Sequence, residues 1–269
     1  MSERDSYEHG VPCWVDHASE SPASAAVFYS ELLGWTTEET MPPEATASYL
    51  IARLRERDVA AISSQGLEGA PPAWNTYVAV DDADAAAERA SAAGGNVLAP
   101  PFDVFDAGRM AVVQDPGGAV FSVWQANRHR GAGIVNEPGA LAWNELTTRA
   151  VDTSLPFYAA VFGWRSAALE MPAGRYFTWH LAGDGEPDPQ SAIGGLMPMD
   201  GDLWPSDLPA HWMTYFAVSD LDASTQLATT LGGLVAVAPF DTPAGRIAVL
   251  NDPVGAAVSL IQLPAPAQP

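Results

Sequence analysis

The chain has 269 residues, of which 48% are hydrophobic and 17% charged, and its formal net charge is −21. This composition provides enough apolar residues for two hydrophobic cores, and the negative charge argues against binding to nucleic acid or to an anionic membrane surface. The single cysteine, Cys13, excludes an intramolecular disulfide and favours a reducing compartment. Because the N-terminus is polar and no apolar run reaches about 18 residues, we expect a cytoplasmic protein.

The first half of the chain predicts two successive units of strands around one helix. Ser21 and Pro22 are typical of a helix start, and Gly34 of a helix end. Asp82 is a candidate N-cap for an alanine-rich second helix, which the pair Gly94-Gly95 ends. The expected elements are, in order, strand 11–18, helix 22–33, strands 49–54 and 59–64, strand 77–80, helix 83–93, and strands 96–99, 110–114 and 119–124.

The second half predicts the same order of elements after a polar, glycine-containing linker at 127–138. A flexible linker of this length spans roughly 20 Å, which lets two neighbouring domains dock on each other. The expected elements are, in order, strand 140–146, helix 153–162, strands 175–181 and 191–197, strand 214–218, helix 221–231, and strands 234–237, 247–251 and 257–262.

Two sequence motifs occur once in each half, in the same order. Phe-Tyr followed by Gly-Trp occurs at 28–35 and at 157–164, and Ala-Gly-Arg followed by Asp-Pro-x-Gly occurs at 107–118 and at 244–255. A repeat of this length is the signature of a duplicated domain rather than of a short-period solenoid. We therefore predict an α+β protein made of two tandem domains, at 8–126 and 138–263, each with two βαβββ units.

These two motifs make the chain resemble the vicinal oxygen chelate superfamily, which includes glyoxalase I, extradiol dioxygenases and bleomycin-resistance proteins. It looks most like the two-domain actinobacterial members described as glyoxalases or hydroxylases. The resemblance implies domains with curved mixed sheets. It does not assign a function, because the superfamily contains both enzymes and proteins that only bind a ligand.

The resemblance also implies where a metal would be bound, since the family draws ligands from the first and last strands of its units. Six of these ligand positions can be located in the sequence, and none of them holds a His, a carboxylate or a thiol. Moving the expected positions along the strands by two residues would bring in only Asp16 or Glu145. We therefore expect no metal and no other cofactor. The six positions are Trp14, Asn75, Ser122, Trp143, Met213 and Ser259.

Aromatic and polar residues occupy these positions and their neighbours two residues away on the same face of each strand. Large rings with a few polar groups are typical of a small-molecule pocket, and the alternative is an ordinary packed core. A carboxylate stands at the same place in both copies, and on a buried face it needs a partner or a ligand. The predicted cupped faces contain Trp14, Asp16, Asn75, Tyr77, Ser122 and Trp124 in the first domain, and Trp143, Glu145, Met213, Tyr215, Ser259 and Ile261 in the second.

Other polar residues have simpler interpretations. His180, beside Trp179 in a predicted strand, is a candidate ligand-binding residue of the second domain. His17 and His211 are expected at the surface. Arg109 and Arg246 are expected to form ion pairs within a hairpin, with Asp103 and Asp241 respectively, and Cys13 is expected to be packed in the core.

Three functions remain open from the sequence. The leading hypothesis is metal-independent binding of a small apolar or aromatic organic molecule, as in sequestration of an antibiotic or a metabolite. The alternative is a lyase, isomerase or hydroxylase/oxygenase that acts on a small carbonyl or phenolic substrate, with Asp16 or Glu145 as general base. The third is a scaffold with filled pockets. We also expect a monomer with internal pseudo-twofold symmetry and a more polar pocket in the first domain.

Overall fold

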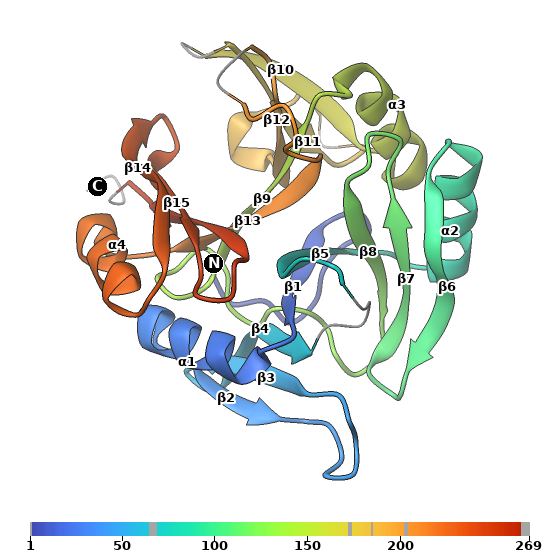
Figure 1. The fold of residues 1–269 in the computed structure, drawn as a ribbon. Coiled ribbons are helices and arrows are strands. Elements are labelled where there is room, and N and C mark those ends of the chain that lie inside the picture. Colours follow the sequence, from blue (N-terminus) through green and yellow to red (C-terminus); the bar gives the residue numbers. More distant parts are fainter. Residues whose placement is uncertain (1, 65–68, 172–173, 184, 202–203, 265–269) are drawn as a thin grey trace.

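The computed structural model describes residues 2–64, 69–171, 174–183, 185–201 and 204–264, which form two eight-stranded mixed sheets (Figure 1). The first sheet has the strand order β2-β3-β4-β1-β5-β8-β7-β6. The elements of the first domain are β1 Pro12–Ser19, α1 Pro22–Leu33, β2 Thr36–Glu39, β3 Tyr49–Leu54, β4 Arg57–Ser64, β5 Ala73–Ala79, α2 Ala83–Ala92, β6 Asn96–Val104, β7 Gly108–Gln114 and β8 Val120–Ala126.

The second sheet repeats this order as β10-β11-β12-β9-β13-β16-β15-β14. Within each domain the two βαβββ units meet at an antiparallel central pair, β1 with β5 and β9 with β13. The predicted duplication and α+β class are therefore confirmed. The elements of the second domain are β9 Leu141–Thr148, α3 Val151–Phe162, β10 Arg165–Met171, β11 Gly174–His180, the short 3-10 helix η1 Pro189–Ser191, β12 Gly194–Pro198, β13 His211–Ala217, α4 Leu221–Thr230, β14 Leu234–Thr242, β15 Gly245–Asn251 and β16 Ala257–Gln262.

Most helix ends agree with the sequence signals. Gly34 ends α1 in the left-handed conformation, at a φ of 75°, which a glycine adopts without steric cost. The side chain of Asp82 accepts a hydrogen bond from the amide of Ala85 and caps α2. Ser21 precedes α1, but its side chain makes no capping hydrogen bond. The strands β2 and β10 were not predicted, and all four residues of β2 are exposed, so no apolar alternation marks it.

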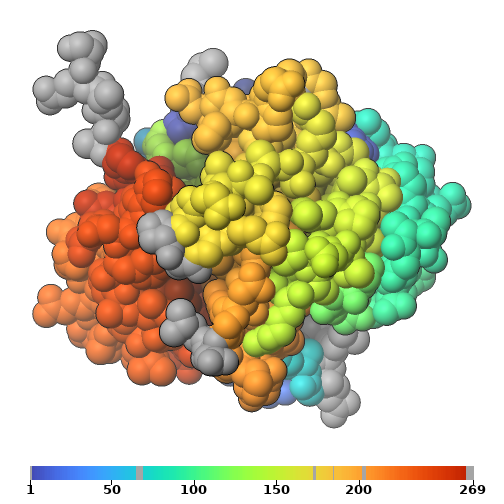
Figure 2. Space-filling view, turned by 90° about the horizontal axis from the view of Figure 1, so that it is seen from above, coloured from blue at the N-terminus to red at the C-terminus, as the bar shows by residue number. Residues whose placement is uncertain are grey.

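The helices join the two domains. Helix α1 packs against α4, and α2 packs against α3 (Figure 1). One hydrophobic core therefore combines the first unit of the first domain with the second unit of the second, and another core combines the two remaining units. Figure 2 shows the β10–β11 region in yellow on the outer surface, between the red C-terminal unit and the green to teal part of the first domain.

The predicted linker is not a loose polar loop. Ile134 and Val135 are buried, and isolated β-bridges join this segment to Glu3 and to Leu141. The apolar residues at 132–135 explain the difference, because they bury their side chains against the first core.

The Asp-Pro turns of the repeat lie at the contact between the domains. The Asp252 carboxylate accepts a hydrogen bond from the Tyr29 hydroxyl at 3.0 Å, and it lies 2.9 Å from Nε2 of His17. In the other copy the Tyr158 hydroxyl donates to Asp115 at 3.1 Å. The tyrosine of the Phe-Tyr motif in each domain thus bonds the aspartate of the Asp-Pro turn in the other domain.

The prediction that His17 lies at the surface is wrong, because its side chain is fully buried. Its strand neighbour Asp16 faces away from the helices, so His17 faces the core between the domains, where Asp252 is its charged partner. Burial alone would raise the pKa of Asp252, but the hydrogen bond and charge of His17 lower it below the ordinary value. Burial raises the pKa of Asp115, which has no histidine beside it.

The two repeated arginines form ion pairs, although not mainly within the hairpin. Arg109 lies 3.0 Å from Asp103 but bonds Asp84, in the first turn of α2, through two nitrogens. Arg246 does the same with Asp222. Cys13 is fully buried as expected, and burial raises the pKa of its thiol. Within the residues that the structure describes, no helix is long and apolar enough to cross a membrane.

Candidate functional site

Each sheet has one face covered by helices and one helix-free face, which corresponds to the predicted cupped face. Strand register places Asp16 beside Asn75 and Trp14 beside Tyr77, and Tyr77 lies beside Ser122 on the next strand. The second sheet repeats these pairs with the equivalent residues. The predicted residues of each domain are therefore brought together on one face by the central strands.

In the first domain the buried carboxylate of Asp16 is the centre of a hydrogen-bonded group, here called the first carboxylate cluster. The Asn75 amide donates to Asp16 at 2.8 Å and the Tyr77 hydroxyl donates at 2.7 Å. The Tyr49 hydroxyl approaches at a longer 3.4 Å, and the Trp14 indole N–H donates to that hydroxyl at 3.2 Å.

In the second domain the buried carboxylate of Glu145 is the centre of an equivalent group, the second carboxylate cluster. The Tyr176 hydroxyl donates to Glu145 at 2.7 Å and the Tyr215 hydroxyl at 2.8 Å. The Trp143 indole N–H donates to the Tyr176 hydroxyl at 3.0 Å. Met213 stands where the first cluster has its amide, so this carboxylate has two side-chain donors instead of three.

Burial sets the protonation of both clusters. It raises the pKa of Asp16 and of Glu145, while the hydrogen bonds from the phenols act in the opposite direction. Burial and the neighbouring carboxylates also raise the pKa of the four tyrosines well above the ordinary value, so at neutral pH these phenols keep their protons. Each cluster thus presents a carboxylate in an apolar wall, held by neutral hydroxyl donors.

The outer residues of the two faces differ in character. The ring of Trp124 packs against Tyr77, with centroids 6.3 Å apart, and its indole N–H donates to the carbonyl of His129. The equivalent Ile261 packs in an apolar cluster with Met213 and Tyr215. Ser259 lies beside Tyr215, as Ser122 lies beside the equivalent tyrosine of the first domain.

His180 is buried on the helix-free face of the second domain, but it makes no bond to Glu145. Its ring nitrogens contact the hydroxyls of Thr178 at 2.8 Å and of Ser191 at 3.1 Å. His211, at the start of β13, contacts the carbonyl of Pro209.

Sequence reasoning missed Tyr49 and Tyr176, the second phenol of each cluster. They stand at equivalent positions of β3 and β11, as the strand registers show, so an alignment of the two copies through these strands would have found them. It also missed His129 of the linker, whose ring lies edge-on to Trp14 at a centroid distance of 4.3 Å.

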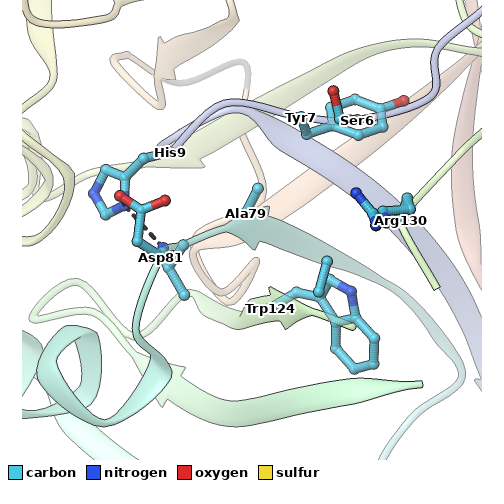
Figure 3. A pocket seen from close by; sticks show the side chains of 9 residues that line it. Ser6, Tyr7, His9, Ala79, Asp81, Trp124 and Arg130 are labelled. Atoms are coloured by element: carbon cyan, nitrogen blue, oxygen red, sulfur yellow. Dashed lines mark hydrogen bonds and ion pairs between the residues drawn. The ribbon is translucent and has the colours of Figure 1, made fainter. Parts of the chain in front are cut away.

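A pocket of about 80 Å³ opens next to the first helix-free face. Trp124 lines it together with the N-terminal segment and the end of β5, and Figure 3 shows Arg130 pointing toward it from the linker side. At the other end His9 lies 3.7 Å from Asp81. The pocket thus adjoins the first carboxylate cluster through the indole of Trp124, which packs on Tyr77.

The residues present do not fit a metal ion. Among the described residues, no three His, Cys, Asp or Glu side chains lie together as metal ligands. Each cluster has one carboxylate, and phenol hydroxyls already donate to its oxygens. Tryptophan, asparagine, methionine and serine occupy the six positions where the resemblance places the family's ligands.

The fold is that of a two-domain vicinal oxygen chelate protein, with four βαβββ units. The model of the Glyoxalase/Bleomycin resistance protein/Dioxygenase superfamily matches residues 14–123 and 135–260, and the chain belongs to that superfamily. Over its whole length it is 44% identical to the whole of "Putative glyoxylase CFP32" of Mycobacterium tuberculosis. It is 36% identical to "Anthracycline biosynthesis protein DnrV" of Streptomyces peucetius, over 94% of each chain.

Solved structures share the fold at low sequence identity. The Mn(II)-bound glyoxalase from Novosphingobium aromaticivorans has a TM-score of 0.62 and is 14% identical, with 97% of this chain and 83% of that chain covered. The 2,3-dioxygenase LapB from Pseudomonas sp. KL28 has a TM-score of 0.63 at 14% identity, with 98% and 97% covered.

Proposed function

We propose that this protein binds a small, largely apolar or aromatic organic molecule on its helix-free faces without a metal ion. The observation that carries this proposal is the duplicated cluster of a tryptophan, a carboxylate and two tyrosines in place of metal ligands. Burying a carboxylate costs free energy unless its lone pairs are satisfied. Both copies keep one, although its type differs between Asp16 and Glu145.

The chemistry of the clusters suits a ligand with rings and a few polar hydrogens. The partly exposed indole of Trp143 offers flat apolar surface, whereas Trp14 is buried against His129, and the carboxylates accept hydrogen bonds from a hydroxyl or an N–H group. The name of the relative DnrV supports this class, because anthracyclines are fused aromatic ring systems with phenol and ketone groups. Sequestration of such a molecule is one use of this binding.

The pocket beside Trp124 limits the size of the ligand. Its volume of about 80 Å³ is smaller than the roughly 300–1,000 Å³ of sites that enclose drug-sized ligands. A ligand with several rings therefore requires the pocket wall to move, whereas a single polar ring substituent fits without movement.

Membership of a superfamily that contains glyoxalases and dioxygenases supports catalysis as a second candidate function. In this case Asp16 acts as a general base on a bound carbonyl or phenolic substrate, because burial raises its pKa toward neutrality, and Tyr77 donates a hydrogen bond. A lyase, an isomerase or a hydroxylase could use such a pair.

Titration of chelator-treated protein with 1,4-dihydroxyanthraquinone, followed by tryptophan fluorescence, tests the binding proposal. We expect saturable quenching that chelators do not change, and at least tenfold weaker binding in Asp16→Asn or Glu145→Gln. The variant Asp103→Asn, at an exposed carboxylate, is the matched control and should bind normally. Quenching that requires added metal would refute the proposal, and product formation that Asp16→Asn abolishes would favour the enzyme.

We further propose that the chain is a monomer, because its two domains already pair through two shared cores. Light scattering during size-exclusion chromatography should give a mass near 28.3 kDa. A dominant species of twice that mass would contradict the proposal.

A further inference from the structure

Arg165 is a cation of the second domain with two buried nitrogens that find no partner among the described residues. It follows Trp164, which packs in the core between the helices and the sheet, so Arg165 faces the helix-free side of β10. Its register partner is His180 on β11. Its Nε and Nη2 atoms are buried, and no hydrogen-bond partner is found for either within the part of the chain that the structure describes.

Nε and Nη2 form the edge of a guanidinium that grips a carboxylate with two parallel hydrogen bonds. The same protein uses this edge at Arg109, where Nε and Nη2 hold the two oxygens of Asp84 at 2.6 and 2.9 Å. At Arg165 the equivalent pair of donors is buried, and the described part of the chain offers it no such acceptor. Leaving buried charged donors unpaired is costly, and an acceptor that is not among the described residues would explain them.

The equivalent strand positions of the first domain lack such an arginine. There Thr36 stands at the position of Arg165, and Arg53 stands at the position of His180. The guanidinium of Arg53 is neutralised by Glu38 and by Asp58, the latter at 2.8 Å. The first domain therefore has no unpaired cation at these two positions.

We propose that Arg165 binds the carboxylate group of a small organic anion at the helix-free face of the second domain. On the same face of β11 a row of side chains continues from His180 through Thr178 to Tyr176, whose hydroxyl accepts a hydrogen bond from the indole of Trp143. An apolar or aromatic body attached to the carboxylate would lie along this row, so an arylcarboxylate suits the site better than a simple inorganic anion. The site does not use Glu145 and stands even if the carboxylate clusters bind nothing.

Thermal unfolding measured at constant ionic strength tests this proposal. The added anion is benzoate, acetate, phosphate or chloride. We expect benzoate to raise the melting temperature of the wild-type protein more than acetate does, and phosphate and chloride to raise it least. The variant Arg165→Met should lose the benzoate shift. Without benzoate it should be as stable as the wild type or more stable, because two buried donors without a partner among the described residues are removed.

Two further variants keep the test decisive. Arg175→Met removes a cation from the neighbouring strand, where the guanidinium lies over the ring of Phe177, and should keep the benzoate shift. Arg165→Lys keeps the charge without the two-donor edge and should lose most of the shift. A shift that persists in Arg165→Met, a shift with phosphate but not with carboxylates, or no shift in the wild type would overturn the proposal. Loss of the shift in Glu145→Gln would show that the anion uses the carboxylate cluster instead.

Discussion

The two carboxylate clusters are built on one plan, and they differ in how closely the second phenol approaches the acid. Tyr176 lies 2.7 Å from Glu145, whereas Tyr49 lies 3.4 Å from Asp16. The strand residue beside each acid is Gly195 in the second domain and Ala61 in the first. A Cβ atom at Gly195 would lie only 1.8 Å from the Tyr176 hydroxyl, so the close approach requires glycine.

This difference separates a closed cluster from an open one. In the second domain two phenols hold Glu145 tightly, and Met213 adds no polar group. In the first domain Asn75 and Tyr77 donate to Asp16 at 2.8 and 2.7 Å, and the contact with Tyr49 is loose, so the Tyr49 hydroxyl is the donor that a ligand can replace most easily. The amide of Asn75 and the loosely held hydroxyl of Tyr49 make the first site the one that we expect to bind the more polar ligand.

The largest effect on stability is expected at the Asp-Pro turns, because the contacts of Asp252 and Asp115 with the other domain differ. Leu146 stands at the position equivalent to His17, so the variant His17→Leu makes the Asp252 contact resemble that of Asp115. Because it removes the 2.9 Å contact of His17 from a buried carboxylate, we expect a loss of about 3 kcal/mol in the free energy of unfolding at pH 7. Urea denaturation measures this loss.

The pH dependence of that loss follows from the lowered pKa of Asp252. A carboxylate whose pKa is lower in the folded protein stabilises it above the unfolded pKa of about 3.9, and this stabilisation disappears as the pH falls through the folded value. The gap between wild type and His17→Leu should therefore close in acid. A gap that stays constant down to acid pH would show that packing, and not charge, is lost.

The exchange of the two strand residues should have the next largest effect. Gly195→Ala forces Tyr176 away from Glu145, and we expect a loss of about 1–3 kcal/mol in stability. The reciprocal variant Ala61→Gly introduces no clash and should cost about 0.5–1 kcal/mol, since glycine weakens a strand. Chemical denaturation compares the two, and equal losses would contradict the view that glycine admits the tyrosine.

A smaller effect is expected from the charge of Glu145 itself. Burial raises its pKa, so the folded protein binds this proton more tightly than the unfolded chain does. Its contribution to stability is complete below the unfolded pKa and is lost as the pH rises through the higher folded value, at about 1.4 kcal/mol for each unit of difference. Wild type should therefore lose stability relative to Glu145→Gln as the pH rises from about 4 to 7. Parallel stability curves would mean that the phenol hydrogen bonds cancel the effect of burial.

The sequence predicts the fold well because the duplication repeats every strong signal. The glycine at the end of α1 and the aspartate before α2 mark helix ends locally, so both were found. The burial of His17 was not predictable in this way, because its partner Asp252 is far away in the sequence and belongs to the other domain. Tyr49 was missed for a related reason, since its contact with Asp16 follows from the registers of β3 against β4 and of β4 against β1.

Calorimetric titration of chelator-treated protein with Mn²⁺, Fe²⁺ or Zn²⁺ tests the central claim most directly, because it asks whether the helix-free faces of this superfamily member still bind a metal. The account predicts no stoichiometric binding of any of the three ions, since each cluster has one carboxylate already engaged by phenols. One tight metal site per domain, lost in Asp16→Asn or Glu145→Gln, would contradict it.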